Sequence, residues 1–121
     1  MNKEVYFFDT YAIFEVIRGN PNYQKYIECR PIVTVFNLAE LNYNLKKEFS
    51  KKMADKYTKK FWINTITVLP SDIENAMDLK LKKKELSIPD AVGYTIARRM
   101  GIKLLTGDND FKDLDNVEFV K

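Results

Sequence analysis

The sequence predicts a single α/β domain in which a mainly parallel sheet is flanked by helices. Short apolar or β-branched runs alternate along the chain with longer segments whose apolar residues recur at helical intervals. This alternation is typical of domains that build a parallel sheet from strand–helix–strand units. A chain of 121 residues can bury a full core, and it contains no repeat, low-complexity tract or linker. We therefore expect residues 1–121 to form one domain.

Five segments are expected to be strands because they are short, apolar and mostly rich in β-branched residues. Asp9 ends the first of them and Pro70 ends the third, while the last is short and lies near the edge of the sheet. The predicted strands cover residues 5–8, 31–35, 65–69, 102–106 and 117–120.

Six segments are expected to be helices. Gly19 stops the first and Gly101 stops the last, and Ser71 with Glu74 forms a capping pair at the start of the fifth. Phe61 and Trp62 fall at core-like spacing near the end of the fourth helix, so we expect both to pack in the interior. The predicted helices cover residues 10–18, 22–28, 36–45, 50–62, 71–81 and 87–100.

The composition excludes several mechanisms. The chain has no histidine, so it cannot build a Ser-His-Asp triad, a His-ligated zinc site or a histidine-based ribonuclease mechanism. Any hydrolysis must use carboxylates, metal ions, lysines or tyrosines. Cys29 is the single cysteine, and the first strand begins too early to leave room for a signal peptide, so we expect a cytoplasmic protein. No apolar run approaches the roughly 18 residues that span a bilayer, so no membrane partner is expected.

Four carboxylates lie where apolar elements begin, end or turn to a buried face. Asp9 and Asp108 each follow a predicted strand, Glu40 lies among apolar residues of a predicted helix, and Asp90 opens another helix. Acids at such positions are unfavourable unless they are paired, and functional groups of parallel sheets gather beyond the carboxyl ends of the strands. If the four converge, their natural partner is a divalent metal ion and their natural chemistry is phosphodiester hydrolysis.

Each of these acids also has a purely structural explanation. Asp9 could cap the helix that follows it, and Glu40 could face solvent. Asp90 stands three residues after Ser87, the spacing of a capping box. Asp108 opens an Asp-Asn-Asp sequence of the kind that turns prefer. Taken singly, no position identifies a site.

Taken together and in this order, the four motifs resemble those of the PIN domain, and especially the single-domain ribonuclease toxins of the VapC type. The resemblance covers essentially the whole chain and rests on Phe8-Asp9-Thr10, Asn37-Leu38-Ala39-Glu40-Leu41, Pro89-Asp90-Ala91 and Leu105-Thr106-Gly107-Asp108-Asn109-Asp110-Phe111. Two positions depart from it. Gly107 stands where family members often carry arginine, which removes a possible phosphate contact, and Gly93 interrupts the helix after Asp90, at a cost of about 1 kcal/mol relative to alanine.

The resemblance implies a three-layer α/β/α fold with a mainly parallel central sheet of four to five strands. It also implies a Mg²⁺- or Mn²⁺-dependent endoribonuclease in which water attacks the phosphodiester and leaves a 5′-phosphate and a 3′-hydroxyl. The implied partners are an RNA substrate, a small antitoxin that covers or enters the acidic site, and a second copy of the chain in a homodimer. The implied catalytic carboxylates and metal ligands are Asp9, Glu40, Asp90 and Asp108, with Asp110 as an outer ligand or turn residue and Thr10 and Thr106 as supporting hydroxyls.

The formal charge of +3 suits a polyanionic substrate drawn to a basic surface around an acidic centre. Lysines crowd the segment 46–60, and Lys51, Lys52 and Lys59 are candidates for phosphate-backbone contacts, although a solvated helix face explains most of the group equally simply.

Two other functions fit parts of the pattern. A phosphate-accepting receiver-like domain also places acids beyond parallel strands, but it needs an acidic pair after the first strand, where this chain has only Asp9. A non-catalytic PIN-like module that binds RNA or a protein would keep the fold without the chemistry.

Overall fold

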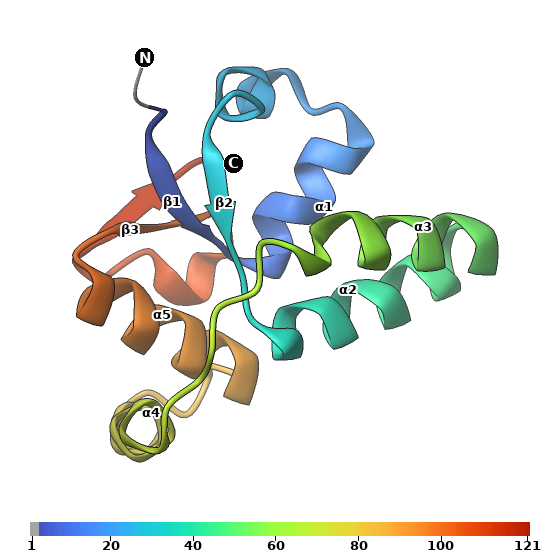
Figure 1. The fold of residues 1–121 in the computed structure, drawn as a ribbon. Coiled ribbons are helices and arrows are strands. Elements are labelled where there is room, and N and C mark those ends of the chain that lie inside the picture. The colour runs from blue at the N-terminus through green and yellow to red at the C-terminus, as the bar shows by residue number, and fades with distance from the viewer. Residues whose placement is uncertain (1–2) are drawn as a thin grey trace.

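The computed structural model describes residues 3–121 and forms three layers, with a central sheet between two groups of helices (Figure 1). The elements in chain order are β1 (Val5–Phe8), α1 (Thr10–Arg18), the 3₁₀ helix η1 (Pro21–Tyr26), β2 (Arg30–Ile32), α2 (Val35–Glu48), α3 (Lys51–Trp62), α4 (Pro70–Lys82), α5 (Ile88–Met100), β3 (Lys103–Thr106), the 3₁₀ helix η2 (Asn109–Phe111) and β4 (Val117–Phe119).

The sheet has four strands in the order β2-β1-β3-β4, and every pairing is parallel. Phe7 of β1 pairs with Ile32 of β2 on one side and with Leu104 of β3 on the other, so β1 and β3 occupy the centre. The prediction of a mainly parallel sheet of four to five strands is confirmed. Because all strands run the same way, their carboxyl ends lie along one edge of the sheet.

The prediction of a strand at residues 65–69 is wrong. Only Thr65 forms an isolated parallel bridge, with Val33, and the backbone N–H of Ile66 donates to the Val33 carbonyl over 2.9 Å. The neighbouring strand, predicted at residues 31–35, ends at Ile32, because Thr34 caps α2 and the chain becomes helical at Val35. The β-branched run therefore has a strand's composition but no continuous partner.

Adjacent side chains on the central strands face the two opposite layers, as the two-residue period of a strand requires. Phe8 and Leu105 belong to the core beneath α1, α2 and α3, whereas Phe7 and Leu104 belong to the core beneath α4 and α5. Burial on both sides explains why the middle of each central strand carries consecutive apolar residues, Phe7 and Phe8 in β1 and Leu104 and Leu105 in β3. The predicted α/β/α layering is confirmed by these two cores.

Most helix boundaries agree with the sequence prediction to within a residue or two, with three corrections. The predicted capping pair of Ser71 and Glu74 is wrong, because α4 begins at Pro70 and the Asp72 carboxylate accepts from the Leu69 N–H over 2.8 Å.

The segment expected as a helix at 22–28 is a 3₁₀ helix that begins at Pro21, with the Asn20 side chain accepting from the Asn22 N–H at its start. Phe61 is buried as expected, but Trp62 is 57% exposed at the last position of α3.

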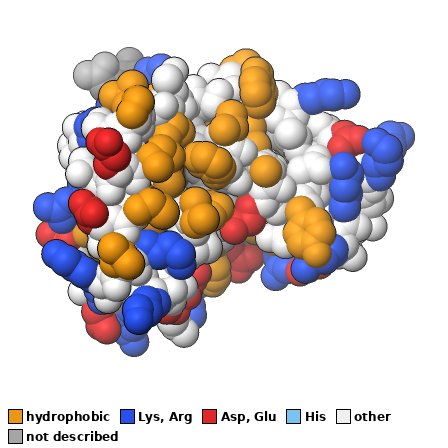
Figure 2. Space-filling model, turned by 90° about the horizontal axis from the view of Figure 1, so that it is seen from below, with side chains coloured by type: hydrophobic (Ala, Val, Ile, Leu, Met, Phe, Trp, Pro, Cys, Tyr) orange, Lys and Arg blue, Asp and Glu red, His pale blue; other side chains and the backbone are white. Residues whose placement is uncertain are grey.

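Trp62 is one of several large hydrophobic side chains that remain exposed. Ile63 follows it, and Leu69, Ile73 and Leu81 lie at the start of α4 or on it. Figure 2 shows hydrophobic side chains gathered in the middle of the face that includes α4, with basic side chains toward its margins. Exposed apolar surface of this kind marks contact regions in many proteins.

Gly93 has a structural purpose that its helix propensity does not reveal. A Cβ atom at this position would lie 2.7 Å from Cε1 of Phe7, whose side chain is fully buried in β1. The glycine therefore allows α5 to approach the central strand closely. The close helix–sheet contact that the glycine permits offsets its unfavourable helix propensity.

Within the part of the chain that the structure describes, none of the helices combines the length and the apolar character that a membrane crossing requires.

Candidate metal-binding and active site

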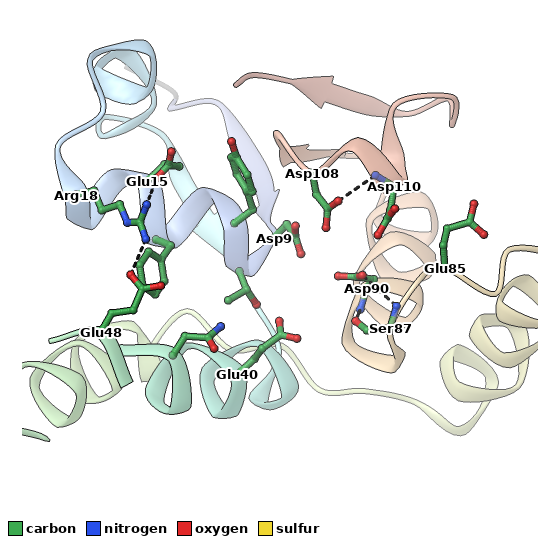
Figure 3. Close-up of a pocket in the computed structure, with 14 residues that line it drawn as sticks. Asp9, Glu15, Arg18, Glu40, Glu48, Glu85, Ser87, Asp90, Asp108 and Asp110 are labelled. Carbon is green, nitrogen blue, oxygen red and sulfur yellow. Dashed lines mark hydrogen bonds and ion pairs between the residues drawn. The ribbon is translucent and has the colours of Figure 1, made fainter. Parts of the chain in front are cut away.

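A cavity of about 570 Å³ opens at the carboxyl ends of β1 and β3. Its floor and walls come from α1, α2, α5 and the turns after β3 and before α5 (Figure 3). Eight of its lining residues are acidic and one, Arg18, is basic. The lining residues are Asp9, Thr10, Tyr11, Phe14, Glu15, Arg18, Glu40, Asn44, Glu48, Glu85, Ser87, Asp90, Asp108 and Asp110.

Asp9 lies deepest, with 3% of its surface exposed. It occupies the N-cap position of α1, but its side chain makes no capping hydrogen bond. Its carboxylate instead accepts a hydrogen bond of 2.8 Å from the hydroxyl of Thr106 at the end of β3. The capping explanation therefore fails for this residue, and the carboxylate stays directed into the cavity.

Asp90 and Asp108 each form local hydrogen bonds at the start of a helix and also line the cavity. Asp90 forms the predicted capping box, because its carboxylate accepts from the Ser87 N–H over 3.0 Å and its own N–H donates to the Ser87 hydroxyl over 3.2 Å. Asp108 accepts from the Asp110 N–H over 2.9 Å at the start of η2. Each carboxylate is thus held by backbone donors while still lining the cavity.

Three carboxylates from distant parts of the chain converge. One oxygen atom each from Asp9, Asp90 and Asp108 lies within 4.8 Å of the other two, and we call this group the carboxylate triad. Glu40 is half-buried and points into the cavity from α2, on the far wall, but it is not part of this close group. Asp110 lines the cavity at an exposed position.

The two threonines named as supporting residues have different contacts. The Thr106 hydroxyl donates to Asp9 and accepts from the Asp108 N–H over 3.1 Å, so it holds two members of the triad. The Thr10 hydroxyl accepts from the Asn37 side-chain amide over 3.2 Å and therefore ties α1 to α2. Thr106 is the direct support of the site, and Thr10 fixes the wall opposite to it.

The triad is electrostatically unfavourable on its own. Burial, followed by the nearby charge of Asp90, raises the pKa of Asp9 to about 8 despite the opposing hydrogen bond from Thr106. Burial also raises the pKa of Asp90 to about 6, against the lowering effect of its hydrogen bonds with Ser87. Carboxylates that resist ionisation because of burial and mutual repulsion are relieved by a bound cation.

The sequence analysis missed several cavity residues that a helical period identifies. Glu40, Asn44 and Glu48 are spaced four residues apart on α2 and share one face. Arg18 extends the facing wall from the end of α1 and forms an ion pair of 2.6 Å with Glu48. Extending the spacing from Glu40 along its helix would have found the α2 wall.

The three lysines named as substrate contacts do not line the cavity. Lys51, Lys52 and Lys59 are exposed on α3, and Lys51 forms an ion pair of 2.6 Å with Asp55. A solvated helix face accounts for their positions, and any contact with a nucleic acid would lie outside the cavity.

Gly107 occupies a position with no room for a larger residue. A Cβ atom there would collide with the Val120 carbonyl oxygen and would lie 2.5 Å from Cε1 of Tyr11. The arginine that the resemblance suggests at this position would therefore require the neighbouring chain to move. Tyr11 occupies the space beside it.

A carboxylate-lined cavity at the carboxyl edge of a parallel sheet defines an α/β domain with a candidate divalent-metal site. The chain belongs to the PIN domain family, whose model matches residues 6–117. This membership removes the receiver-like alternative.

The fold is similar to those of two solved structures. One is a toxin-antitoxin complex from Klebsiella pneumoniae, at 20% identity and a TM-score of 0.72, covering 95% of this chain and 95% of that one. The other is VapBC2 from Rickettsia felis bound to a DNA fragment from their promoter, at 17% identity and a TM-score of 0.72, covering 97% of this chain and 99% of that one. No curated protein matches the chain.

Proposed function

We propose that this protein is a metal-dependent endoribonuclease and the toxin of a toxin–antitoxin pair. The observation that carries the proposal is the approach of the Asp9, Asp90 and Asp108 carboxylates to within 4.8 Å of one another in a cavity of about 570 Å³. PIN domains are in general nucleases. In this chain the four acids of the sequence motifs, Asp9, Glu40, Asp90 and Asp108, all line one cavity.

The donor set fits a hard divalent cation such as Mg²⁺ or Mn²⁺. All three triad ligands are carboxylate oxygens, which these ions prefer over nitrogen and sulfur. Burial and the charges of neighbouring carboxylates raise the pKa values of Asp9 and Asp90, and a bound cation would oppose both effects. Asp9, Asp90 and Asp108 would hold the ion, with Asp110 as an outer ligand. A bound divalent ion supplies an acidified water and neutralises charge that develops on the phosphate.

The protein's own residues then orient the reaction. Thr106 keeps the Asp9 carboxylate directed into the cavity, and the Ser87 cap does the same for Asp90. Glu40 faces the triad from α2 and would hold the attacking water by accepting its proton in a hydrogen bond. Attack of water on phosphorus with departure of the 3′-oxygen leaves a 5′-phosphate and a 3′-hydroxyl.

The substrate is proposed to be single-stranded RNA. The reaction does not need a 2′-hydroxyl, so discrimination against DNA would come from contacts along the cavity wall. Lys52 and Lys59 on α3 remain candidates for the backbone of a longer RNA, since both are exposed, whereas Lys51 is already engaged with Asp55. RNA as substrate also agrees with a cytoplasmic location.

The proposed partners are an antitoxin and a second copy of the chain. One similar structure is a toxin–antitoxin complex and the other is VapBC2 bound to promoter DNA. In this chain the eight acids of the cavity would receive a basic antitoxin segment. The exposed Ile73 and Leu81 of α4 offer apolar surface for a homodimer. Lysine at either position should convert the dimer to a monomer in light scattering, and an unchanged mass would exclude this surface.

Cleavage of RNA by the wild type and by Asp9→Asn tests the proposal. Purified protein is incubated with mixed single-stranded RNA and Mg²⁺ or Mn²⁺, with Asp113→Asn as a matched control because Asp113 is exposed and lies outside the cavity. We expect cleavage by the wild type and the control and none by Asp9→Asn. Equal background in all three would falsify the proposal, and RNA binding without cleavage would favour the non-catalytic module.

A further inference from the structure

Tyr11, in the cavity wall, has the position expected of a residue that contacts substrate. Tyr11 lies two residues after Asp9 on α1 and lines the same cavity as the carboxylate triad. Asp9 is buried at the floor of the cavity, whereas Tyr11 is half-buried in its wall. A ligand whose reacting group reaches the triad would therefore have its adjoining part beside Tyr11.

The Tyr11 ring is held in place by its neighbours. It packs against Tyr23 with ring centroids 6.4 Å apart, and the Tyr23 hydroxyl donates to the Val120 carbonyl over 2.6 Å. That carbonyl is also the atom nearest to the missing Cβ of Gly107, and the Tyr11 ring is the next nearest group. The Tyr11 ring is thus packed against Gly107 and Tyr23, close to the Val120 carbonyl, and any side chain at position 107 would displace the ring.

The Tyr11 hydroxyl differs from those of the tyrosines around it. Tyr23 donates to Val120, and Tyr26 donates to Glu118 over 2.7 Å, so both hydroxyls are used by the fold. Among residues 3–121, Tyr11 has no hydrogen-bond partner for its hydroxyl, and no side-chain polar atom is buried without one. The Tyr11 hydroxyl therefore remains free to donate a hydrogen bond, on a residue that lines the cavity and whose ring packs against Tyr23.

We propose that Tyr11 is a substrate-binding residue whose hydroxyl donates a hydrogen bond to the nucleotide adjoining the scissile phosphate. The inference rests on the proposed nuclease function and identifies a contact by which this chain engages an oligonucleotide. A pre-positioned donor loses little freedom when it binds, so its contribution is retained in affinity. In this chain Tyr11 takes the space beside Gly107, where the resemblance leads one to expect a basic phosphate contact.

The test distinguishes the contribution of the Tyr11 hydroxyl from that of its ring, and contacts to the neighbouring nucleotide from contacts to the scissile phosphate. Wild type, Tyr11→Phe and Tyr43→Phe are compared on a single-stranded RNA oligonucleotide and on bis(4-nitrophenyl) phosphate, a diester without nucleotides. Tyr43 is the matched control because it is 63% exposed on α2 and lies outside the cavity. Thermal unfolding and Mn²⁺ affinity are measured for all three proteins.

For Tyr11→Phe we expect kcat/KM on RNA to fall about tenfold or more, the typical effect of losing one hydrogen bond to a charged or strongly polar acceptor. Cleavage of the small diester, Mn²⁺ affinity and the unfolding temperature should stay unchanged, and Tyr43→Phe should match the wild type throughout. Equal RNA cleavage by Tyr11→Phe and the wild type would overturn the inference. So would an equal loss on both substrates together with weaker Mn²⁺ binding, because the residue would then act through the metal site.

If the wild type cleaves neither substrate, the nuclease proposal fails while the Tyr11 contact is still tested by binding. Affinity for a fluorescent single-stranded RNA is then measured in the presence of Ca²⁺. Binding that is at least several-fold weaker in Tyr11→Phe than in the wild type supports the contact, and equal or absent binding by both refutes it.

Discussion

Replacing Asp9 by asparagine should stabilise the metal-free protein above neutral pH, although it removes a proposed metal ligand. Burial and the charge of Asp90 raise the pKa of Asp9 from its ordinary value of 3.8 to about 8. A difference of this size corresponds to at most about 6 kcal/mol between the two protonation states. Solvent in the open cavity screens part of this energy, so we expect a gain of about 3 kcal/mol. The amide can still accept the hydrogen bond from Thr106.

The pH dependence has a defined sign. The folded-state pKa of Asp9 lies above its unfolded-state value, so the protonated carboxyl stabilises the fold fully below about pH 4. This contribution is lost as the pH rises through about 8. The wild type should therefore lose stability between pH 5 and pH 9 relative to Asp9→Asn. The buried Asp72, whose pKa Arg99 holds below its usual range, affects stability only at lower pH.

Thermal unfolding in the presence of a chelator measures this effect. For a chain of this length, about 3 kcal/mol corresponds to roughly 12 °C in Tm. Asp9→Asn should unfold about that much higher than the wild type at pH 9 and at nearly the same temperature at pH 5. Asp113→Asn should follow the wild type at both. A difference that does not change with pH, or a variant that is less stable at pH 9, would refute the electrostatic argument.

Three further substitutions test the supports of the site and the fold. Thr106→Val removes the hydroxyl that holds two triad members, and Mn²⁺ affinity measured by calorimetry should fall about tenfold with little loss of secondary structure. Gly93→Ala should lower the free energy of unfolding by about 1–2 kcal/mol in urea titration, because the clash with the buried Phe7 ring outweighs the gain in helix propensity. Arg99→Ala should cost about 2–3 kcal/mol in the same assay, since it leaves the Asp72 carboxylate, 1% exposed, without its guanidinium partner. A stability equal to that of the wild type would contradict either of the last two.

The positions of the triad were predictable because they follow from the geometry of parallel strands. Asp9 and Asp108 come directly after β1 and β3, and adjacent parallel strands bring their carboxyl ends together. Asp90 was identified together with its capping role, and the structure has it in both roles. The sequence does not decide whether Asp9 caps its helix, because the residue occupies the N-cap position whether or not its side chain forms the capping hydrogen bond.

The errors concern contacts between residues far apart in the chain. Composition alone indicated a strand at 65–69, but strand formation depends on a partner, and β2 ends too early to provide one. Trp62 has core-like spacing yet lies at the last turn of α3, where no layer covers it. The clash that Gly93 avoids, and the one that Gly107 avoids, arise only after helices and strands pack. A local sequence pattern does not reveal which residues from distant segments come into contact.

The central claim is that Asp9, Asp90 and Asp108 form one divalent-metal site, and a Mn²⁺ titration followed by electron paramagnetic resonance tests it most directly. The wild type should bind Mn²⁺, and added Mg²⁺ should displace the bound Mn²⁺. Asp108→Asn should weaken Mn²⁺ binding at least tenfold, whereas Asp113→Asn should leave it unchanged. Wild-type protein that binds no Mn²⁺, or that binds it equally well without the Asp108 carboxylate, would contradict the account.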